Sequence, residues 1–218
     1  MDILTTLEEA RRATNVLEHP FYRRWSAGEM SGGELRCYAG EYRHAVLALA
    51  RASARAADGA GPAHRAELRR HAEEEAAHVA LWDAFARATG ATPPAASGRP
   101  MLAQTRSCVE AWTAGESLLE HLAVLYAIEG GQPDISRAKL DGLIDHYGYS
   151  AEGPATEYFR VHALRDTVHA RQAGELIAEL MCEASDREEQ AERMLRRASR
   201  ALRGNWRLLD GVEAQARA

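Results

Sequence analysis

Lysine is almost missing from this chain of 218 residues: of its 27 basic residues, Lys139 is the only lysine, and the others are arginine. Arginine cannot lose its proton and act as a nucleophile or as a source of amine nitrogen, whereas lysine can. The single retained lysine therefore indicates a chemical role for Lys139. Its survival without any function is an alternative that this observation leaves open.

Long apolar runs and blocks of like charge are also missing. No apolar stretch approaches the roughly 20 residues that cross a bilayer, and the formal net charge is only −5. The first residues lack the charged and apolar segments of a secretion signal. We therefore expect neither a membrane nor a nucleic acid as a partner. The three scattered cysteines are typical of reduced thiols and favour a cytoplasmic location.

Strand patterns are nearly absent, and helical periodicity recurs along the chain. This periodicity predicts one all-α domain over residues 1–218, with seven or eight helices and no long linker. The predicted helices cover residues 3–17, 21–27, 31–57, a segment that ends near 90, 102–129 with a possible break at Gly115, a segment through Lys139 that ends near 147, 154–183 and 185–212. A loop is predicted at 90–100, and capping boxes are predicted at Ser31 and Ser185.

Three ionisable residues occupy the apolar face of one predicted helix. His162, Asp166 and His169 follow at intervals of four and three residues, so their side chains share one face. The other members of that face are Phe159, Ala163, Ala170, Ala173, Leu176, Ile177 and Leu180. Burying ionisable groups without partners costs several kcal/mol. A bound cation is the simplest explanation, because imidazoles and carboxylates are ligands that first-row metals prefer.

Two other predicted helices show the same pattern. On one, an apolar stripe passes through His71, through Glu74 or Glu75, and through His78; on the other, an apolar stripe ends at Glu129. Each residue taken alone is more often a solvated or hydrogen-bonded side chain than a ligand. Together, the three helices predict a two-metal carboxylate site. The spacings differ from the Glu-x-x-His motifs of ferritin-like bundles, so we do not expect that fold.

Several segments, in order along nearly the whole chain, resemble the haem-oxygenase-like diiron oxidases and oxygenases. The matching segments are residues 18–29, 38–42, 78–82, 126–129 and 162–169. The resemblance implies a seven-helix, haem-oxygenase-like bundle of the TenA and PqqC type that binds no haem. It also implies a set of metal ligands: Glu74, His78, Glu129, His162, Asp166 and His169.

The match departs from the family at the first pair of ligands. Family members often carry a longer insert between the Glu and the His, whereas three residues separate Glu74 from His78 here. Glu74 aligns best, and Glu75 is the alternative. For His71 we expect a role next to the metal ligands rather than among them.

Within this family, the chain most resembles a branch that makes p-aminobenzoate for folate from one of its own tyrosines. The tyrosine precursor corresponds to Tyr22, a second functional tyrosine to Tyr38 and the amine donor to Lys139. One departure is Ile128, which stands where that branch has a tyrosine. Without the resemblance, both tyrosines read equally well as core aromatic residues with hydrogen-bonded hydroxyls.

The resemblance further implies two metal ions, Fe/Fe or Mn/Fe, with dioxygen as co-substrate and an external reductant. No external organic substrate is expected on this interpretation, and a homodimer is favoured by the resemblance alone. One alternative is an oxygenase with the same ligands that acts on an external amine, amino acid or fatty acid. A second is a metal-free TenA/PqqC-like enzyme, although none of Cys37, Cys108 and Cys182 lies on a ligand stripe. A third is a non-catalytic binding protein.

Overall fold

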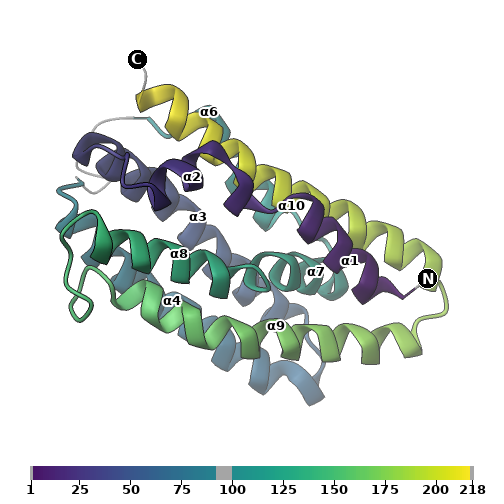
Figure 1. Ribbon diagram of the computed structural model, residues 1–218. Coiled ribbons are helices and arrows are strands. Elements are labelled where there is room, and N and C mark those ends of the chain that lie inside the picture. Colours follow the sequence, from purple (N-terminus) through teal and green to yellow (C-terminus); the bar gives the residue numbers. More distant parts are fainter. Residues whose placement is uncertain (1, 92–99, 217–218) are drawn as a thin grey trace.

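The protein is all-α in the computed structural model, which describes residues 2–91 and 100–216 (Figure 1). The helices are α1 (Ile3–Ala13), α2 (Pro20–Ser26), α3 (Gly32–Gly59), α4 (Pro62–Ala88), α6 (Ala103–Thr113), α7 (Leu118–Glu129), α8 (Gln132–Asp145), α9 (Glu157–Glu183) and α10 (Arg187–Ala216), with a short 3₁₀ turn, η1, at Val16–Glu18. Among the described residues, eight helices have eleven residues or more and there is no strand. The all-α class is therefore confirmed.

Local side-chain contacts explain where several helices begin. The Ser31 side chain accepts from the Glu34 backbone N–H, and the Glu34 side chain accepts from that of Ser31, which confirms the first capping box. Ser117 caps α7 in a similar way, so the chain does break near Gly115. Most of the loop predicted at 90–100 lies outside the described residues.

Two predicted helix boundaries were wrong. The first helix ends at Ala13 rather than near residue 17, because the side chain of Asn15 accepts from the Leu17 backbone N–H and starts the separate turn η1. An Asn side chain competes with helical backbone hydrogen bonds in this manner. The last helix begins at Arg187, so the residue in front of it is Asp186 rather than Ser185.

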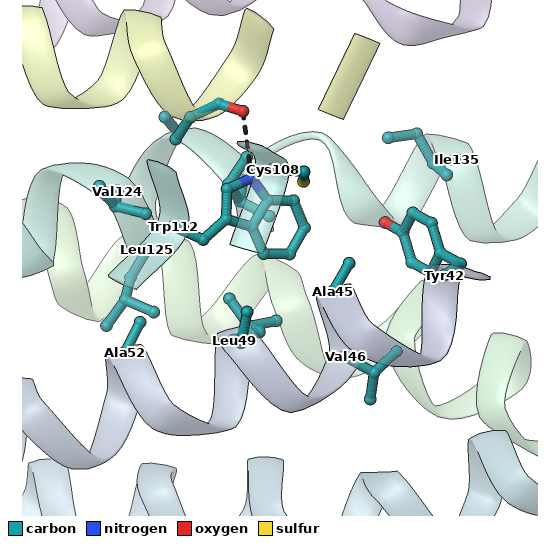
Figure 2. Packing of buried hydrophobic residues seen from close by; sticks show 14 of the residues in the cluster. Tyr42, Ala45, Val46, Leu49, Ala52, Cys108, Trp112, Val124, Leu125 and Ile135 are labelled. Atoms are coloured by element: carbon teal, nitrogen blue, oxygen red, sulfur yellow. Dashed lines mark hydrogen bonds between the residues drawn. The ribbon is translucent and has the colours of Figure 1, made fainter. Parts of the chain in front are cut away.

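Helix α3 is the central element and packs against α4, α6, α7 and α10. The core is continuous around it: Leu49 of α3 and Leu125 of α7 are buried near Trp112 of α6 (Figure 2). The Trp112 indole N–H donates to the Ala201 carbonyl of α10 at 3.0 Å, which joins α6 to α10. Helix α9 packs against α4, α7 and α8 on another side of the bundle. No described helix is both long and apolar enough to cross a membrane.

Candidate metal centre

Three ligand-type side chains line one face of α4. His71, Glu75 and His78 follow at intervals of four and three residues, which places them on one face over two helical turns. All three are buried, and Glu75 is only 1% exposed. Glu75 Oε1 lies 3.0 Å from His78 Nδ1, within hydrogen-bonding distance. The face that they share is therefore an interior face of the bundle.

Helices α7 and α9 bring four more ligand-type residues to the interior. Glu129 is the last residue of α7 and is fully buried. His162, Asp166 and His169 of α9 are buried as well. The trio predicted from its spacing thus lies on an interior face of α9, a helix that packs against both α4 and α7.

The ligand atoms form two groups that share Glu75. The first group consists of His71, Glu75, Glu129 and His169, and the second of Glu75, His78 and His162. Within each group, one candidate ligand atom per residue lies within 4.8 Å of the others. Asp166 adjoins the first group, with Oδ1 at 3.9 Å from His169 Nδ1. Two adjacent groups with a common carboxylate fit a pair of metal ions.

Several buried polar atoms of the centre have no hydrogen-bond partner among the described residues. They are Glu129 Oε2, His162 Nε2, His169 Nδ1 and both carboxylate oxygens of Asp166, whereas His71 Nε2 pairs with Glu129 Oε1 at 2.9 Å. An unsatisfied buried polar group costs about 1–3 kcal/mol, and native proteins contain few of them. Five such atoms from two neighbouring helices, α7 and α9, therefore fit bound metal ions.

The electrostatics agree with this interpretation. Burial lowers the pKa of His162 to about 4, so its imidazole is neutral and can coordinate a metal. Burial disfavours the charged form of His71, but the nearby Glu129 carboxylate outweighs burial and raises that pKa to about 9, so a metal ion would have to displace the proton of His71. Burial, together with the charges of Glu75 and Glu129, raises the pKa of Asp166 well above its ordinary value. A cation would relieve the repulsion among these carboxylates.

Hydrogen bonds on the far side of two imidazoles orient them toward the centre. His162 Nδ1–H donates to the Tyr158 carbonyl at 2.7 Å, which leaves Nε2 as the free acceptor. His169 Nε2–H donates to Glu74 Oε2 at 3.1 Å, which leaves Nδ1 facing Asp166. Metal-binding histidines commonly donate their second N–H to a carbonyl or carboxylate in this way, which fixes the tautomer.

The structure gives Glu74 and Glu75 different places. The Glu74 side chain is 31% exposed and contacts His169 and Arg165, whereas Glu75 belongs to both groups of ligand atoms. Helical spacing could not separate them, because positions three and four residues before His78 lie on the same face. His71 also lies within the first group, and its spacing of seven residues from His78 was the signal for that placement.

Glu74→Gln is expected to weaken ferrous ion binding about 10- to 100-fold while leaving the number of bound ions unchanged, because the amide holds the His169 ring less firmly than a carboxylate does. Anaerobic competition with a chelator measures this affinity. Glu73→Gln is the matched control, since Glu73 is the neighbouring residue on the exposed side of α4. Equal affinities in both variants would show that the Glu74–His169 contact does not support the metals.

Lys139 of α8 lies in a cage of aromatic rings. It is 1% exposed, and its Nζ lies 5.5, 5.0 and 4.5 Å from the ring centroids of Tyr22, Tyr38 and Tyr42. The rings of Trp82 and Phe159 complete the cage. Each ring attracts an ammonium by about 0.5–2 kcal/mol, but desolvation of a fully buried charge is larger. Burial therefore holds the pKa of Lys139 well below its ordinary value.

A continuous series of rings connects this cage with the metal centre. Tyr158 stacks on His162 at 3.9 Å between ring centroids, and it meets Trp82 edge-on at 4.8 Å. Trp82 in turn lies 5.8 Å from Tyr38. Neither Tyr158 nor Trp82 is among the site residues predicted from the sequence. Their positions could have indicated a place beside the metal ligands, because Tyr158 precedes His162 by one helical turn and Trp82 follows His78 by one helical turn.

Comparison with known proteins adds a family and a fold. A family described as iron-containing redox enzymes matches residues 36–206. The chain is 31% identical to the 4-aminobenzoate synthase of Nitrosomonas europaea, over 92% of this chain and 87% of that one. A TenA homologue from Pseudomonas syringae superimposes with a TM-score of 0.82 at 18% identity, covering 97% of this chain and 91% of that one.

A further solved structure is described as a domain of unknown function with a haem-oxygenase-like fold, from Shewanella denitrificans. It superimposes with a TM-score of 0.80 at 16% identity and covers all of this chain and 94% of that one. At such identities the two structures establish the fold alone. The haem-oxygenase-like, TenA-type bundle is therefore confirmed.

Proposed function

The chain belongs to the family of iron-containing redox enzymes, and from this premise we propose that it makes 4-aminobenzoate from one of its own tyrosines, with dioxygen and an external reductant. One observation carries the proposal: the only lysine of the chain is buried among tyrosine rings, and ring contacts through Trp82 and Tyr158 connect it with the metal ligand His162. The relative of this chain from Nitrosomonas europaea is named 4-aminobenzoate synthase.

The proposed metal ligands differ from the set that the resemblance implies. His71, Glu129 and His169 would hold one ion, and His78 and His162 the other, with Glu75 shared between the two ions. Asp166 lies close enough to contribute a carboxylate oxygen. Glu75 thus takes the place of Glu74, and His71 is added. Bound as Fe/Fe or Mn/Fe, the pair would supply the electrons for the activation of dioxygen.

The atoms of the product can be traced to two side chains. 4-Aminobenzoate and a tyrosine side chain share a benzene ring with two substituents opposite each other. The Cβ of tyrosine would become the carboxyl carbon after the Cα–Cβ bond is broken and Cβ is oxidised. The phenolic oxygen would be exchanged for an amine nitrogen. Tyr22 supplies the ring in this scheme, and Lys139 Nζ supplies the nitrogen. The Cε–Nζ bond of Lys139 would be broken, its Cε would be oxidised by dioxygen to an aldehyde, and the phenolic oxygen would leave as water.

The surroundings of Lys139 suit this role. An amine is a nucleophile only without its extra proton, and burial favours that form here. The Tyr38 and Tyr42 rings lie even closer to Nζ than the Tyr22 ring does, so they position the amine and exclude water. The ring series through Trp82 and Tyr158 gives electrons a short path between the tyrosines and the metal centre.

Ile128 is the residue that favours the second candidate, an oxygenase with the same ligands and an external substrate. The Ile128 side chain, however, lines a small cavity with Val16 of η1 and with Leu202 and Asn205 of α10. A phenol at this position would point toward those elements. The departure at Ile128 therefore removes no hydroxyl from the ring series that connects the metals with Lys139.

Tyr22→Phe is expected to lower the yield of 4-aminobenzoate in a single turnover by about 100-fold or more, because phenylalanine lacks the oxygen-bearing carbon that receives the amine. The protein is loaded with Fe(II), or with Fe(II) and Mn(II), supplied with reductant and oxygen, and the released molecules are identified by mass spectrometry. Tyr149→Phe, outside the cage, is the control and should retain the yield. A full yield from Tyr22→Phe would contradict the assignment of Tyr22 as precursor.

A further inference from the structure

A cavity of about 150 Å³ reaches the metal centre from the side away from Lys139. It lies between α4, α7 and α9 and is lined by both His71 and His169 of the first ligand group. On α4, the cavity-lining residues His64 and Leu68 precede the ligands, whereas Trp82 of the aromatic cage follows them. The cavity and the cage therefore lie toward opposite ends of the centre.

This cavity has one apolar wall and one polar wall, the latter formed by His64, His71, His169 and Gln172, and its rim is acidic. The apolar wall consists of Leu68, Leu122, Leu125, Ala173 and Leu176. Glu67, Glu175 and Glu179 lie at the exposed edge, where Glu179 pairs with His64 at 3.2 Å. Small apolar molecules or xenon can bind against the apolar wall of such a cavity.

On the proposed function, the organic precursor is part of the chain and needs no path from solvent. Tyr22, Tyr38 and Trp82 are at most 2% exposed, so the cage itself gives solvent no direct access to the metals. Electrons from a reductant can travel through packed side chains, but dioxygen has to diffuse to the metals as a molecule. The centre therefore requires an apolar opening at some other point.

We propose that this cavity is the path by which dioxygen reaches the metal centre, on the side of His71 and His169. The inference rests on the proposed function and adds the direction of approach, which keeps incoming dioxygen away from Lys139 and the tyrosines. An organic carboxylate would be repelled by Glu67, Glu175 and Glu179. The acidic rim would attract a ferrous ion, but the ion would lose hydration against the leucine side chains farther in, which is costly. Dioxygen, small and apolar, meets neither obstacle.

Crystals of the full chain under xenon pressure locate the cavity without any need for turnover. We expect a xenon atom between Leu125 and Leu176 in the unaltered protein and none in Leu176→Trp, whose indole would fill the space. Absence of xenon from the unaltered cavity would overturn the proposal. Ala173→Leu fills the same space with a smaller side chain and serves if the tryptophan variant fails to fold.

Stopped-flow mixing of the Fe(II)-loaded protein with oxygen tests the path itself. Leu176→Trp should lower the second-order rate constant for dioxygen about 10-fold or more, by steric closure, with iron affinity unchanged. Leu180→Trp is the matched control: Leu180 lies one turn farther along α9 and does not line the cavity. An unchanged rate constant in a variant that has lost its xenon would overturn the proposal. So would slower iron loading at an unchanged oxygen rate.

The yield of 4-aminobenzoate, measured in the same samples, distinguishes failure of the access path from failure of the proposed function. If Leu176→Trp slows oxygen consumption but no variant forms the product, the access path stands and the proposed function fails. If the product forms at full yield and the oxygen rate is insensitive to Leu176, the function stands and the access path fails. If an added amine displaces xenon and is oxidised, the cavity is a substrate site and the proposal is wrong.

Discussion

Lys139→Met is expected to abolish 4-aminobenzoate formation, with a loss of at least about 100-fold, while the protein still folds and binds its metals. Methionine keeps an unbranched, apolar side chain, one heavy atom shorter than that of lysine, and has no nitrogen to transfer. Single-turnover mass spectrometry measures the product, and iron analysis measures the metals. A variant that still forms the product at full yield would show that the nitrogen comes from elsewhere.

Methionine is preferable to arginine for this test, because the cage contains no described carboxylate next to Nζ. Arginine keeps its charge at every relevant pH, so Lys139→Arg would bury a permanent charge among Tyr22, Tyr38 and Tyr42. A buried unpaired charge destabilises a protein by several kcal/mol. Loss of activity in Lys139→Arg would then not distinguish a missing nucleophile from a damaged fold.

The same residue predicts how stability depends on pH. The pKa of Lys139 is lower in the folded protein than in the unfolded chain. Between those two pKa values the unfolded chain binds one more proton, so the free energy of unfolding rises with pH by about 1.4 kcal/mol per unit. Lys139→Met lacks this contribution. Its stability advantage over the unaltered protein should therefore shrink as the pH rises toward 10, as measured by urea unfolding. A constant difference would show that Lys139 is charged inside the cage.

Glu75→Gln is expected to have the second largest effect, the loss of the two-metal centre. Glu75 is the one side chain common to both groups of ligand atoms, and glutamine keeps its size while removing its charge. We expect fewer than two ions per chain and a fall in affinity of more than about 100-fold, beyond the range for a carboxylate that acts through a histidine. Anaerobic iron titration measures both quantities.

Glu74→Gln is the matched control for this assignment, since the two residues are adjacent on α4. Metal ions that bind only the folded protein raise its melting temperature, so added iron should stabilise the unaltered protein and Glu74→Gln but hardly affect Glu75→Gln. The reverse result, with both metals lost in Glu74→Gln and retained in Glu75→Gln, would return the ligand role to Glu74.

The sequence predicted the parts of the site that depend on helical periodicity. The trio on α9, Glu129 at the end of α7 and His78 on α4 were placed on interior faces by apolar stripes, and all are buried. The amino-acid composition alone indicated a role for Lys139, because it is the only lysine. The fold followed from the resemblance and from the absence of strand patterns. These features are local or compositional, so one sequence suffices to see them.

The remaining features depend on how the helices pack. Whether Glu74 or Glu75 faces inward is decided by the rotation of α4 against α9, and periodicity does not resolve adjacent residues. The rings around Lys139 come from α2, α3, α4 and α9. The spacing of residues along the chain does not predict that these four helices meet there. The cavity at His71 and His169 is bounded by leucine side chains together with polar ones from three helices. Only the folded structure brings these together.

The measurement that tests the central claim most directly is a single turnover of isotopically labelled protein. Because Lys139 is the only lysine, lysine labelled with ¹⁵N at the side chain marks one nitrogen per chain, and ring-¹³C tyrosine marks the precursor. The account predicts 4-aminobenzoate with a fully labelled ring and a labelled nitrogen, at no more than one molecule per chain, and a mass loss in the peptide that contains Tyr22. Unlabelled product, or more than one molecule per chain, would contradict it and show that the substrate comes from outside.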